Sequence, residues 1–408
     1  MIERKKNCFL FTQSYPYGEG EIFVGREIVV LSECFNEVVI FPIDCGKEHA
    51  KKLPPNVKVV NLFEQGNTGF NRRKVCFNNF SAFLKLIIGE FRSHPKQTLR
   101  KFKDVANDNL HQLYRAQILS EYILNEPQQQ TVFYSFWFDR WATILGVVKR
   151  KIRNLNFITR AHAFDLYEED NRDGYILNRK FQLENVSEVY SVSKHGAKYL
   201  TKLYPFFSQK FKCSYLGTIP HNYINPFNES TDQFIIVSCG SVQKRKRTTS
   251  FPEVLSHLPE KFKWIHFGSG PEMNLLRELV EKKGLGKRVE LVGHVENEQF
   301  LSYLRTNGVS LFLSLSSNEG LPYTMIEAIS FGIPLMSTDV GGCGEICNDN
   351  TGILIKKDFD PEQVANEILK FKESSKNSLS FRNKVRNYWD DNFNAEKNYR
   401  SFYKEISN

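Results

Sequence analysis

The chain has 408 residues, of which 41% are hydrophobic and 25% are charged, and it carries a net charge of +9. This length exceeds that of one ordinary domain and allows two sizeable hydrophobic cores. No apolar run is long enough for a membrane span or for the apolar part of a signal peptide, and the eight cysteines form no CxxC pair. We therefore expect a cytoplasmic protein with reduced thiols and no metal site built from cysteines.

Short apolar runs typical of strands alternate with helical patterns in two series, which predicts two parallel α/β sheets. The first series comprises residues 8–11, 38–41, 57–60, 132–136, 157–159 and 189–192, and the second comprises residues 234–240, 264–268, 289–293, 309–315 and 334–338. Residues 218–233 lie between the two series and are rich in Pro, Asn, Ser and Thr, which predicts a linker and hinge. We expect Rossmann-like domains over residues 1–220 and 221–385.

A glycine-rich segment with Gly18, Gly20 and Glu21 follows the first predicted strand. Glycines let the backbone approach a ligand closely, so this segment is a candidate binding loop. A plain surface turn is the alternative interpretation.

Residues 70–103 combine basic and apolar side chains. They contain nine Lys or Arg and one acidic residue, Glu90, while apolar residues recur at helical spacing: Phe80, Phe83, Leu84, Ile87, Ile88 and Phe91. A basic amphipathic helix of this kind can lie in the headgroup region of an anionic membrane. Packing on the first domain is the alternative. If the membrane interpretation is correct, alanine at Phe83 and Ile87 should release the protein from anionic vesicles.

Two further candidates in the first domain also follow predicted strands. The segment Arg160-Ala-His162-Ala-Phe-Asp165 comes after the strand at 157–159, so the side chain of His162 should project from a strand end. Ser193 directly follows the strand at 189–192. A single histidine is also common as a structural residue in protein cores.

In the second domain, four consecutive cations, Lys244 to Arg247, follow the first strand. Because open α/β sheets bind ligands at the carboxyl ends of their strands, this run could neutralise a phosphate, although most basic runs are solvated surfaces. Glycine turns follow the next strand, at Gly268 and Gly270, and His294 comes after the strand at 289–293.

Two glutamates flank the Gly320-Leu321-Pro322 segment that follows the strand at 309–315. Pro322 suits the first turn of a helix that continues through Glu327, so Glu319 should stand at the strand-to-helix turn. The N–H groups of Gly320 and Leu321 would then favour a diphosphate. Two carboxylates beside a diphosphate would repel it unless each carboxylate accepts hydrogen bonds from neutral hydroxyls. Sugars supply such hydroxyls, so we expect the transferred sugar at Glu319 and the ribose at Glu327. The alternative is a turn cap and a solvated helix residue.

The Glu-x7-Glu frame, with Gly320, Pro322, the continuation EAISFGIPLMST and Val340-Gly341-Gly342, resembles the donor site of retaining glycosyltransferase family 4. The resemblance is specific over residues 234–345 and looser before them. It implies an α/β protein of the GT-B fold, with two Rossmann-like domains whose parallel sheets face a central cleft. It also implies that a C-terminal helix within residues 386–408 crosses back onto the first domain.

The resemblance further implies roles for individual residues. Lys246 takes the position of a lysine that neutralises the donor diphosphate, whereas Ser241 stands where the family has an arginine, so Arg245 is the candidate substitute. Charge accumulates on the departing diphosphate, so these cations should matter more in the transition state than in binding. The other implied positions are Gly268, Gly270 and His294 near the nucleotide, Gly18, Gly20 and Glu21 in a flexible loop, His162 at the reaction centre, and Asp165 and Ser193 on the acceptor side.

We therefore expect a hexosyltransferase that moves a sugar from a nucleoside-diphosphate sugar, with retention of configuration. UDP is the commonest nucleotide and GDP stays open, and no metal or other cofactor is required. The acceptor would be a glycan or a polyprenyl-diphosphate-linked glycan in surface polysaccharide assembly, and residues 70–103 leave open a peripheral contact with the inner face of the cytoplasmic membrane.

Three other interpretations compete with this one. The chain could be a GT-B epimerase or hydrolase of a nucleotide sugar, or a sugar-nucleotide-binding scaffold without activity. A basic nucleic-acid-binding protein is the alternative from another class, but no nucleic-acid module accompanies the basic tracts, so nucleic acid is not an expected partner.

Overall fold

The computed structural model describes residues 6–18, 21–44, 51–63, 70–126, 130–171 and 173–407. The chain forms two compact units. Unit 1 comprises residues 1–214 with 399–408, and unit 2 comprises residues 215–398.

The division into units differs from the predicted boundaries at both ends of unit 2. Tyr323 Oη donates a hydrogen bond to Gly217 O at 2.7 Å, and Trp389 Nε1 donates one to Thr218 Oγ1 at 2.7 Å. The start of the predicted linker therefore packs into unit 2, and the boundary falls after Ser214 rather than after residue 220. The C-terminal segment that was predicted to cross back onto the first domain, residues 386–408, is also too long. Only residues 399–408 group with unit 1.

Unit 1 contains a parallel sheet of seven strands in the order β3-β2-β1-β4-β5-β6-β7. The strands are β1 (Asn7–Thr12), β2 (Val38–Pro42), β3 (Val57–Val59), β4 (Thr131–Ser135), β5 (Phe157–Ala161), β6 (Glu188–Ser191) and β7 (Phe211–Cys213). All six predicted strands are present. The seventh, β7, consists of three half-buried residues at the sheet edge, so it lacks the apolar run that predicts a strand.

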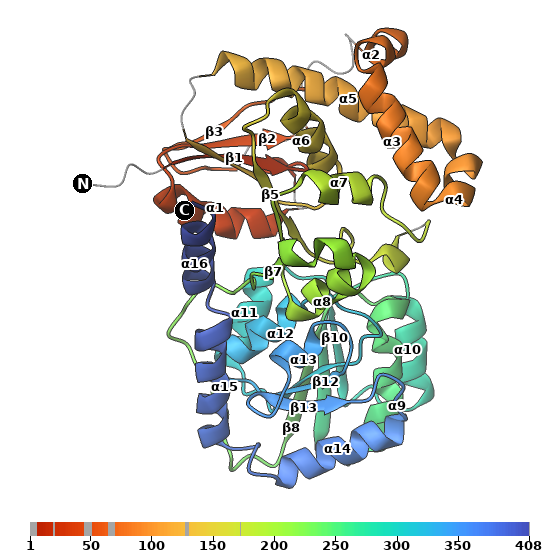
Figure 1. The fold of residues 1–408 in the computed structure, drawn as a ribbon. Coiled ribbons are helices and arrows are strands. Elements are labelled where there is room, and N and C mark those ends of the chain that lie inside the picture. Colours follow the sequence, from red (N-terminus) through yellow and green to blue (C-terminus); the bar gives the residue numbers. More distant parts are fainter. Residues whose placement is uncertain are drawn as a thin grey trace. The chain divides into compact units, whose positions relative to one another are not determined.

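The helices of unit 1 cover both faces of this sheet (Figure 1). They are α1 (Ile22–Cys34), α2 (Arg72–Asn78), α3 (Phe80–Ser93), α4 (Pro95–Arg100), α5 (Phe102–Asn125), α6 (Arg140–Lys151), α7 (Arg179–Asn185), α8 (Lys194–Leu203) and the last part of α16 (Ala395–Ser407). Side chains alternate along β1: Phe9 and Phe11 join the core formed with α5 and α6, whereas Cys8 and Leu10 are buried toward the other face.

Unit 2 contains a parallel sheet of six strands in the order β10-β9-β8-β11-β12-β13. The strands are β8 (Phe234–Cys239), β9 (Phe262–Phe267), β10 (Val289–Gly293), β11 (Leu311–Ser314), β12 (Leu335–Thr338) and β13 (Gly352–Ile355). The sequence predicts all of them except β13, a four-residue strand that is half exposed at the sheet edge.

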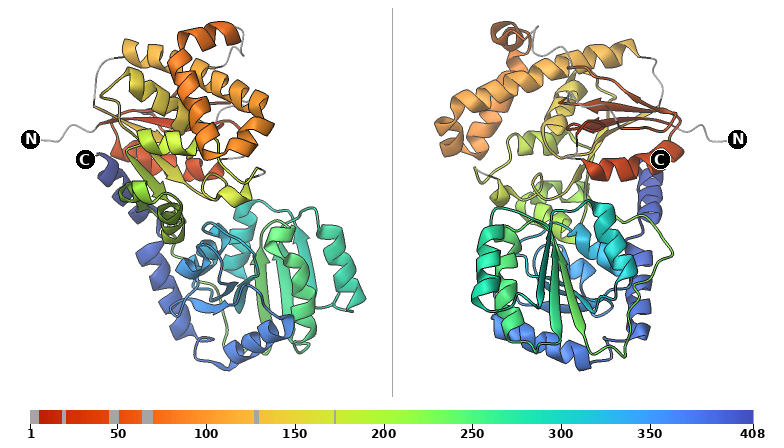
Figure 2. Two further views of the ribbon diagram at one scale, coloured as in Figure 1. Left: turned by 45° about the vertical axis from the view of Figure 1, so that its right-hand side comes forward. Right: turned by 180° about the vertical axis from the view of Figure 1, so that it is seen from behind.

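Helices also lie on both faces of the second sheet (Figure 2). They are α9 (Phe251–Ser256), α10 (Met273–Lys282), α11 (Asn297–Thr306), α12 (Tyr323–Ser330), α13 (Cys343–Ile346), α14 (Pro361–Glu373) and α15 (Leu379–Asn392). One apolar core joins the sheet to α9, α10 and α14, and a second joins it to α11, α12 and α15. The predicted class, α/β with two Rossmann-like units, is confirmed.

Neither a membrane-spanning helix nor a disulfide occurs among the described residues. No helix in the described part of the chain is both long enough and apolar enough to cross a bilayer. The seven cysteines that the structure describes are free thiols.

Candidate active site

The candidate donor residues lie at the topological switch point of the second sheet. From β8 the chain builds outward through β9 and β10, and from β11 it builds in the opposite direction through β12 and β13. At such a point the loops that follow two neighbouring strands diverge and leave a crevice, which is where open α/β sheets bind ligands. The predicted cations follow β8 and Glu319 follows β11, so strand order brings them together.

Glu319 is the centre of this cluster and is 6% exposed. Lys246 Nζ lies 2.5 Å from Oε1, Arg245 Nη1 lies 3.1 Å from Oε2, and Ser316 Oγ donates a hydrogen bond to Oε1 at 2.7 Å. Burial raises the pKa of Glu319, but the charges and hydrogen bonds of Lys246, Ser316 and Arg245 outweigh it and leave the pKa below its ordinary value. Glu319 is therefore a buried carboxylate that is ionised at neutral pH.

The cations differ in what holds them. Arg247 adopts φ 49°, and its guanidinium donates to Leu315 O at 2.6 Å, Ser316 O at 2.8 Å and Lys357 O at 2.8 Å. These bonds tie the loop after β8 to the loop after β11, so Arg247 has a structural task. Lys246 and Arg245 instead direct their charges to Glu319. The structure thus brings Arg245 to the same carboxylate as Lys246.

Two glycines let neighbouring loops lie in contact beneath this cluster. Gly268 has φ 137°, and a Cβ there would lie 2.0 Å from Gly240 O. Gly341 has φ 51°, and a Cβ there would lie 1.7 Å from Glu319 O. Any side chain at Gly341 would displace the backbone of Glu319, so this glycine positions the carboxylate. Gly270 is similarly constrained, because a Cβ would lie 2.5 Å from Val242 O.

Glu327 lies on α12 and is 1% exposed. Its Oε1 accepts a hydrogen bond from Asn297 Nδ2 at 2.8 Å, so it has a separate partner from Glu319. The pKa of the Cys239 thiol is raised to about 12, mainly by burial and also by Glu327, while Lys246 lowers it. The end of β8 therefore lies within the electrostatic reach of both Glu327 and Lys246.

The remaining predicted donor residues occupy the loops around these groups. Pro322 is the N-cap residue of α12, so the helix begins at Tyr323, immediately after the predicted turn. Gly320 is buried and its carbonyl accepts the Gly342 N–H at 3.0 Å, whereas Leu321 is half-buried. His294 is an exposed residue after β10.

Unit 1 has its own switch point, between β1 and β4, and Glu21 lies there. Its carboxylate accepts the backbone N–H groups of Gln13, Ser14 and Tyr15 at 3.0, 2.6 and 2.5 Å, and Trp137 Nε1 donates to it at 2.5 Å. These bonds fasten the loop after β1 to the loop after β4. Glu21 is 4% exposed, so it shapes the predicted loop from inside. Gly18 takes φ 64° in this loop, and Gly20 lies outside the described residues.

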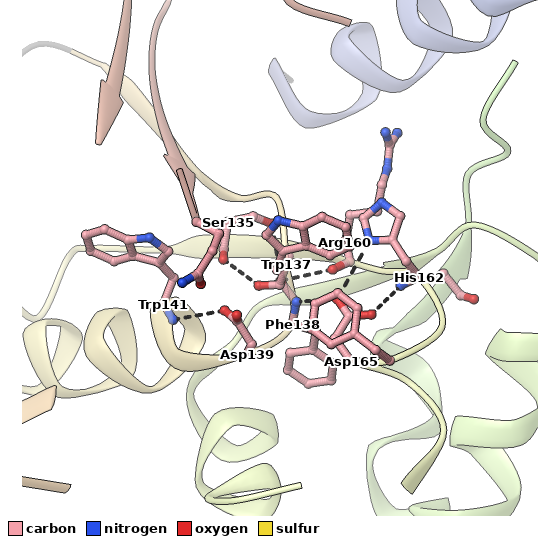
Figure 3. A network of polar contacts seen from close by, with 12 residues as sticks. Ser135, Trp137, Phe138, Asp139, Trp141, Arg160, His162 and Asp165 are labelled. Atoms are coloured by element: carbon pink, nitrogen blue, oxygen red, sulfur yellow. Dashed lines mark hydrogen bonds and ion pairs between the residues drawn. The ribbon is translucent and has the colours of Figure 1, made fainter. Parts of the chain in front are cut away.

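His162 and Asp165 lie together after β5, beside Trp137 (Figure 3). Asp165 accepts the His162 N–H at 2.7 Å and the Phe138 N–H at 2.8 Å, and its Oδ2 lies 3.7 Å from His162 Nδ1. The imidazole is 9% exposed, and among the described residues neither ring nitrogen has a hydrogen-bond partner. Asp165 thus ties the backbone at His162 to the loop after β4, and the ring can still bind a substrate hydroxyl. Ser193, in contrast, is fully buried and caps α8 by accepting the Gly196 N–H at 3.0 Å, which a structural role explains.

Asp139 is a candidate that the sequence analysis missed. It follows β4, caps α6 by accepting the Trp141 N–H at 3.3 Å, and appears beside Asp165 in the network of Figure 3. Burial raises its pKa to about 7, and the charges of Asp165 and Glu21 add to this effect. Its position shortly after the predicted strand at 132–136 could have identified it, because carboxylates at the ends of such strands often belong to binding sites.

The variant Asp139→Asn is expected to gain stability relative to the wild type as the pH rises. The folded-state pKa of about 7 exceeds the ordinary 3.8, so between these values the folded protein binds the proton more tightly than the unfolded chain, and wild-type stability falls as the pH increases. Asparagine keeps the capping oxygen and does not titrate. The Tm difference between the two proteins should grow by about 5 °C from pH 5 to pH 8.

Thermal unfolding of both proteins across this pH range measures the effect. Glu90, whose pKa burial raises to about 7, titrates in both proteins and cancels in the difference. A Tm difference that does not change with pH would contradict an Asp139 carboxyl that is protonated in the folded state.

Comparison with known proteins finds a family match within unit 2. Residues 221–388 match the family model described as glycosyl transferases group 1. This matched segment lies within unit 2. It contains the switch point with Lys246, Arg245, Glu319 and Glu327. No group of three or more His, Cys, Asp or Glu side chains suited to a metal ion occurs among the described residues.

Curated proteins that are similar to part of this chain include glycosyltransferases named for glycolipid and polysaccharide synthesis. One component of phosphatidylinositol N-acetylglucosaminyltransferase from Arabidopsis thaliana is 33% identical over 134 residues, which are 32% of this chain and 30% of that protein. The putative teichuronic acid biosynthesis glycosyltransferase TuaC of Bacillus subtilis is 30% identical over 31% of this chain and 30% of its own. O-antigen biosynthesis glycosyltransferase WbnH of Escherichia coli is 30% identical over 33% of this chain and 36% of its own. The chain thus spans about a third of the length of these relatives.

Solved structures extend the similarity in fold to both units. TarM has a TM-score of 0.71 at 13% identity and covers 99% of each chain. The lipopolysaccharide outer core galactosyltransferase WaaB has a TM-score of 0.67 at 14% identity, over 98% of this chain and 99% of its own. Anabaena HepE in complex with UDP has a TM-score of 0.64 at 13% identity over the same shares. The predicted GT-B fold is confirmed.

Proposed function

We propose that this protein is a glycosyltransferase that moves a sugar from a nucleoside-diphosphate sugar onto a glycan or lipid-linked glycan. The observation that carries the proposal is the pairing of Glu319 with Lys246 and Arg245 at the switch point of the segment that matches the glycosyl transferases group 1 model. Two cations and a carboxylate at one point match a sugar diphosphate, whose phosphates need positive charge and whose hydroxyls need acceptors. The names of TuaC and WbnH support an acceptor in surface polysaccharide assembly.

The ion pairs indicate how the donor would bind. The diphosphate would attract Lys246 and Arg245 away from Glu319, and Glu319 would then accept hydrogen bonds from hydroxyls of the transferred sugar. Because Glu319 is buried, it needs these new donors to stay ionised. Glu327 would accept the ribose hydroxyls in the same way, and the two cations would supply the positive charge that a divalent metal provides at other phosphate sites.

For the transfer we infer retention of configuration. The acceptor oxygen forms its bond to the anomeric carbon on the face from which the diphosphate leaves, and the acceptor proton passes to the departing phosphate oxygen. Unit 1 supplies the acceptor side, with His162 positioned by Asp165 to hold a hydroxyl. The reaction would take place in the cytoplasm, in agreement with free thiols at the described cysteines.

UDP is the nucleotide that the comparisons favour. HepE binds UDP and UDP-glucose in its crystal structures, and TarM binds UDP in one of its complexes. The names of two relatives, the GtfA subunits of two Streptococcus species, specify UDP-N-acetylglucosamine.

Calorimetry without added metal tests the donor site. UDP is expected to bind the wild type more tightly than GDP or ADP, and Glu327→Ala should weaken UDP binding about 10–100-fold, because hydrogen bonds from ribose hydroxyls to a carboxylate are lost. Glu362→Ala is a matched control, because Glu362 lies in the first turn of α14, outside the cluster around Glu319.

The outcomes separate the competing functions. If no nucleotide binds the wild type, the glycosyltransferase proposal fails. If UDP-sugar binds but only free sugar or an epimerised nucleotide sugar forms in the presence of glycan acceptors, the protein is a hydrolase or an epimerase. If a nucleotide sugar binds but no reaction occurs, the protein is a sugar-nucleotide-binding scaffold.

A further inference from the structure

Helices α2, α3 and α4 and the start of α5 carry an exposed apolar surface, which we name the α2–α4 surface. Its exposed apolar side chains are Phe77 (85%), Leu99 (72%), Phe80 (59%), Leu84 (44%), Phe102 (44%) and Ile88 (39%). These are six of the eighteen large hydrophobic side chains that are exposed in the described residues, and they fall within 26 residues of the chain. Scattered exposure needs no explanation, but such concentration marks an interaction site.

The register of α3 shows that this surface is separate from the core. Phe80, Leu84 and Ile88 recur every four residues and form one exposed stripe along the helix. Leu86 and Ile87 are buried, and Phe83 packs against the core. The predicted membrane contact through Phe83 and Ile87 is therefore wrong, because these two residues face the protein. The exposed stripe is the one that a partner could reach.

The charges around this stripe are almost all positive. Residues 70–103 contain nine Lys and Arg and one acidic residue, Glu90, which is 3% exposed and accepts the Asn178 N–H at 2.8 Å. Lys101 and Arg100 pair with Asp173, and the other seven cations have no ion pair with a described residue. Of these, Arg72, Arg73 and Lys74 are exposed in the first turn of α2.

Three cations in the first turn of α2 oppose the helix dipole, whose N-terminus is positive. A cation at this end disfavours the helix, so the stability of unit 1 does not account for them. These cations would attract an anionic partner.

A groove between α3 and α7 continues the same chemistry. It has a volume of about 360 Å³, and Leu84, Ile88 and Phe181 supply part of its apolar lining. Lys85, Arg92 and Lys180 supply positive charges, and Glu90 and Glu184 supply two carboxyl groups. A phosphate headgroup with an apolar chain has this combination of properties.

We propose that the α2–α4 surface docks on an anionic lipid bilayer. Phe77, Phe80, Leu84 and Ile88 enter the boundary between headgroups and acyl chains, and the surrounding cations meet lipid phosphates. Burial of the exposed Phe and Leu side chains and attraction between the cations and lipid phosphates both favour peripheral binding. Self-association through this surface would bring two sets of cations together, and nucleic acid would leave the apolar side chains exposed.

Vesicle flotation of the full chain, without nucleotide, tests the docking. The wild type is expected to bind vesicles of phosphatidylcholine with phosphatidylglycerol and to bind phosphatidylcholine vesicles at least tenfold more weakly, with affinity falling as salt increases. The double variant Phe77→Ser, Phe80→Ser should lose at least tenfold in affinity for the anionic vesicles. The triple variant Arg72→Gln, Arg73→Gln, Lys74→Gln should lose a similar factor.

Matched controls come from other elements of unit 1. Phe206→Ser replaces a 91% exposed phenylalanine in the 3-10 helix Pro205–Lys210, and Lys198→Gln with Lys202→Gln removes exposed cations of α8. Both controls should bind anionic vesicles like the wild type. All substituted side chains are exposed, so circular dichroism and UDP binding should not change. The proposal is independent of the donor site, because vesicle binding is measured without nucleotide.

Three results would overturn the proposal. The first is a wild type that fails to float with anionic vesicles, and the second is a double phenylalanine variant that floats as well as the wild type. The third is a dimer in light scattering that the phenylalanine substitutions disperse without any vesicle binding, which would assign the surface to a second copy of the chain.

Discussion

Replacement of Lys246 by methionine is expected to lower kcat for sugar transfer by about 10²–10³-fold, with a smaller effect on donor KM. Lys246 Nζ contacts the carboxylate of Glu319 at 2.5 Å, so the cation already lies at the donor site before the diphosphate draws it from that carboxylate. Negative charge accumulates on the diphosphate as the bond to the sugar breaks, and a preorganised cation stabilises that charge more than it stabilises the bound donor. Steady-state kinetics with a UDP-sugar and a glycan acceptor measures the change.

Lys244→Met is the matched control for this substitution. Lys244 lies in the same short 3-10 helix, Lys244–Lys246, but its side chain is exposed. Glu319 pairs with Arg245 and Lys246 instead. Its replacement should leave kcat within about twofold of the wild type. A combined Lys246→Met, Glu319→Gln variant should lose less than the product of the two single effects, because the two side chains are in direct contact and their effects are coupled. Equal losses for Lys244→Met and Lys246→Met would show that the loop contributes only general positive charge.

Replacement of Glu27 by glutamine is expected to lower the free energy of unfolding of unit 1 by about 3–5 kcal/mol. Arg160 on β5 and Glu27 on α1 are both buried, and Arg160 Nη1 contacts the two carboxylate oxygens at 3.0 and 2.8 Å. Tyr403 of α16 also donates a hydrogen bond to Glu27, and the guanidinium lies 4.3 Å from the ring centre of Phe402. The substitution leaves a buried arginine without its counter-charge and loosens the end of the chain. Urea unfolding followed by tryptophan fluorescence measures the loss.

A surface ion pair and a double replacement provide the controls. Glu33 pairs with Arg400 at 2.5 Å, and the two side chains are 51% and 47% exposed, so Glu33→Gln should change the free energy of unfolding by about 1 kcal/mol or less. A double variant, Glu27→Leu with Arg160→Met, should recover much of the loss, because it removes both buried charges. If Glu27→Gln and Glu33→Gln have equal effects, the buried network does not hold α16 in place.

The sequence predicted the donor loops well because their signals are local. An apolar run followed by Glu319-Gly-Leu-Pro shows a strand that turns into a helix, and β11 and α12 have this arrangement. The cations after β8 were found in the same way. The short edge strands β7 and β13 were missed, since three or four half-buried residues do not produce an apolar pattern.

Predictions about which way a side chain points were less successful. Phe83 and Ile87 belong to the same apolar pattern as Phe80 and Leu84, and periodicity alone does not tell which side of α3 meets unit 1. Likewise, Glu21 follows a strand end as a ligand-binding residue would, yet four hydrogen bonds from Gln13, Ser14, Tyr15 and Trp137 turn it inward.

The sequence by itself determined the two series of strands, the loops that end them and therefore the chemical groups available at each strand end, because these follow from periodicity and turn residues within a few positions. Only the tertiary structure decided which groups meet. Arg245 and Glu319 are 74 positions apart, and they form an ion pair because β8 and β11 are neighbours in the sheet. The raised pKa of Asp139 and the burial of the Glu27–Arg160 pair have the same origin. Charge interactions depend on distance and burial, and strand order sets both between segments that are remote in the sequence.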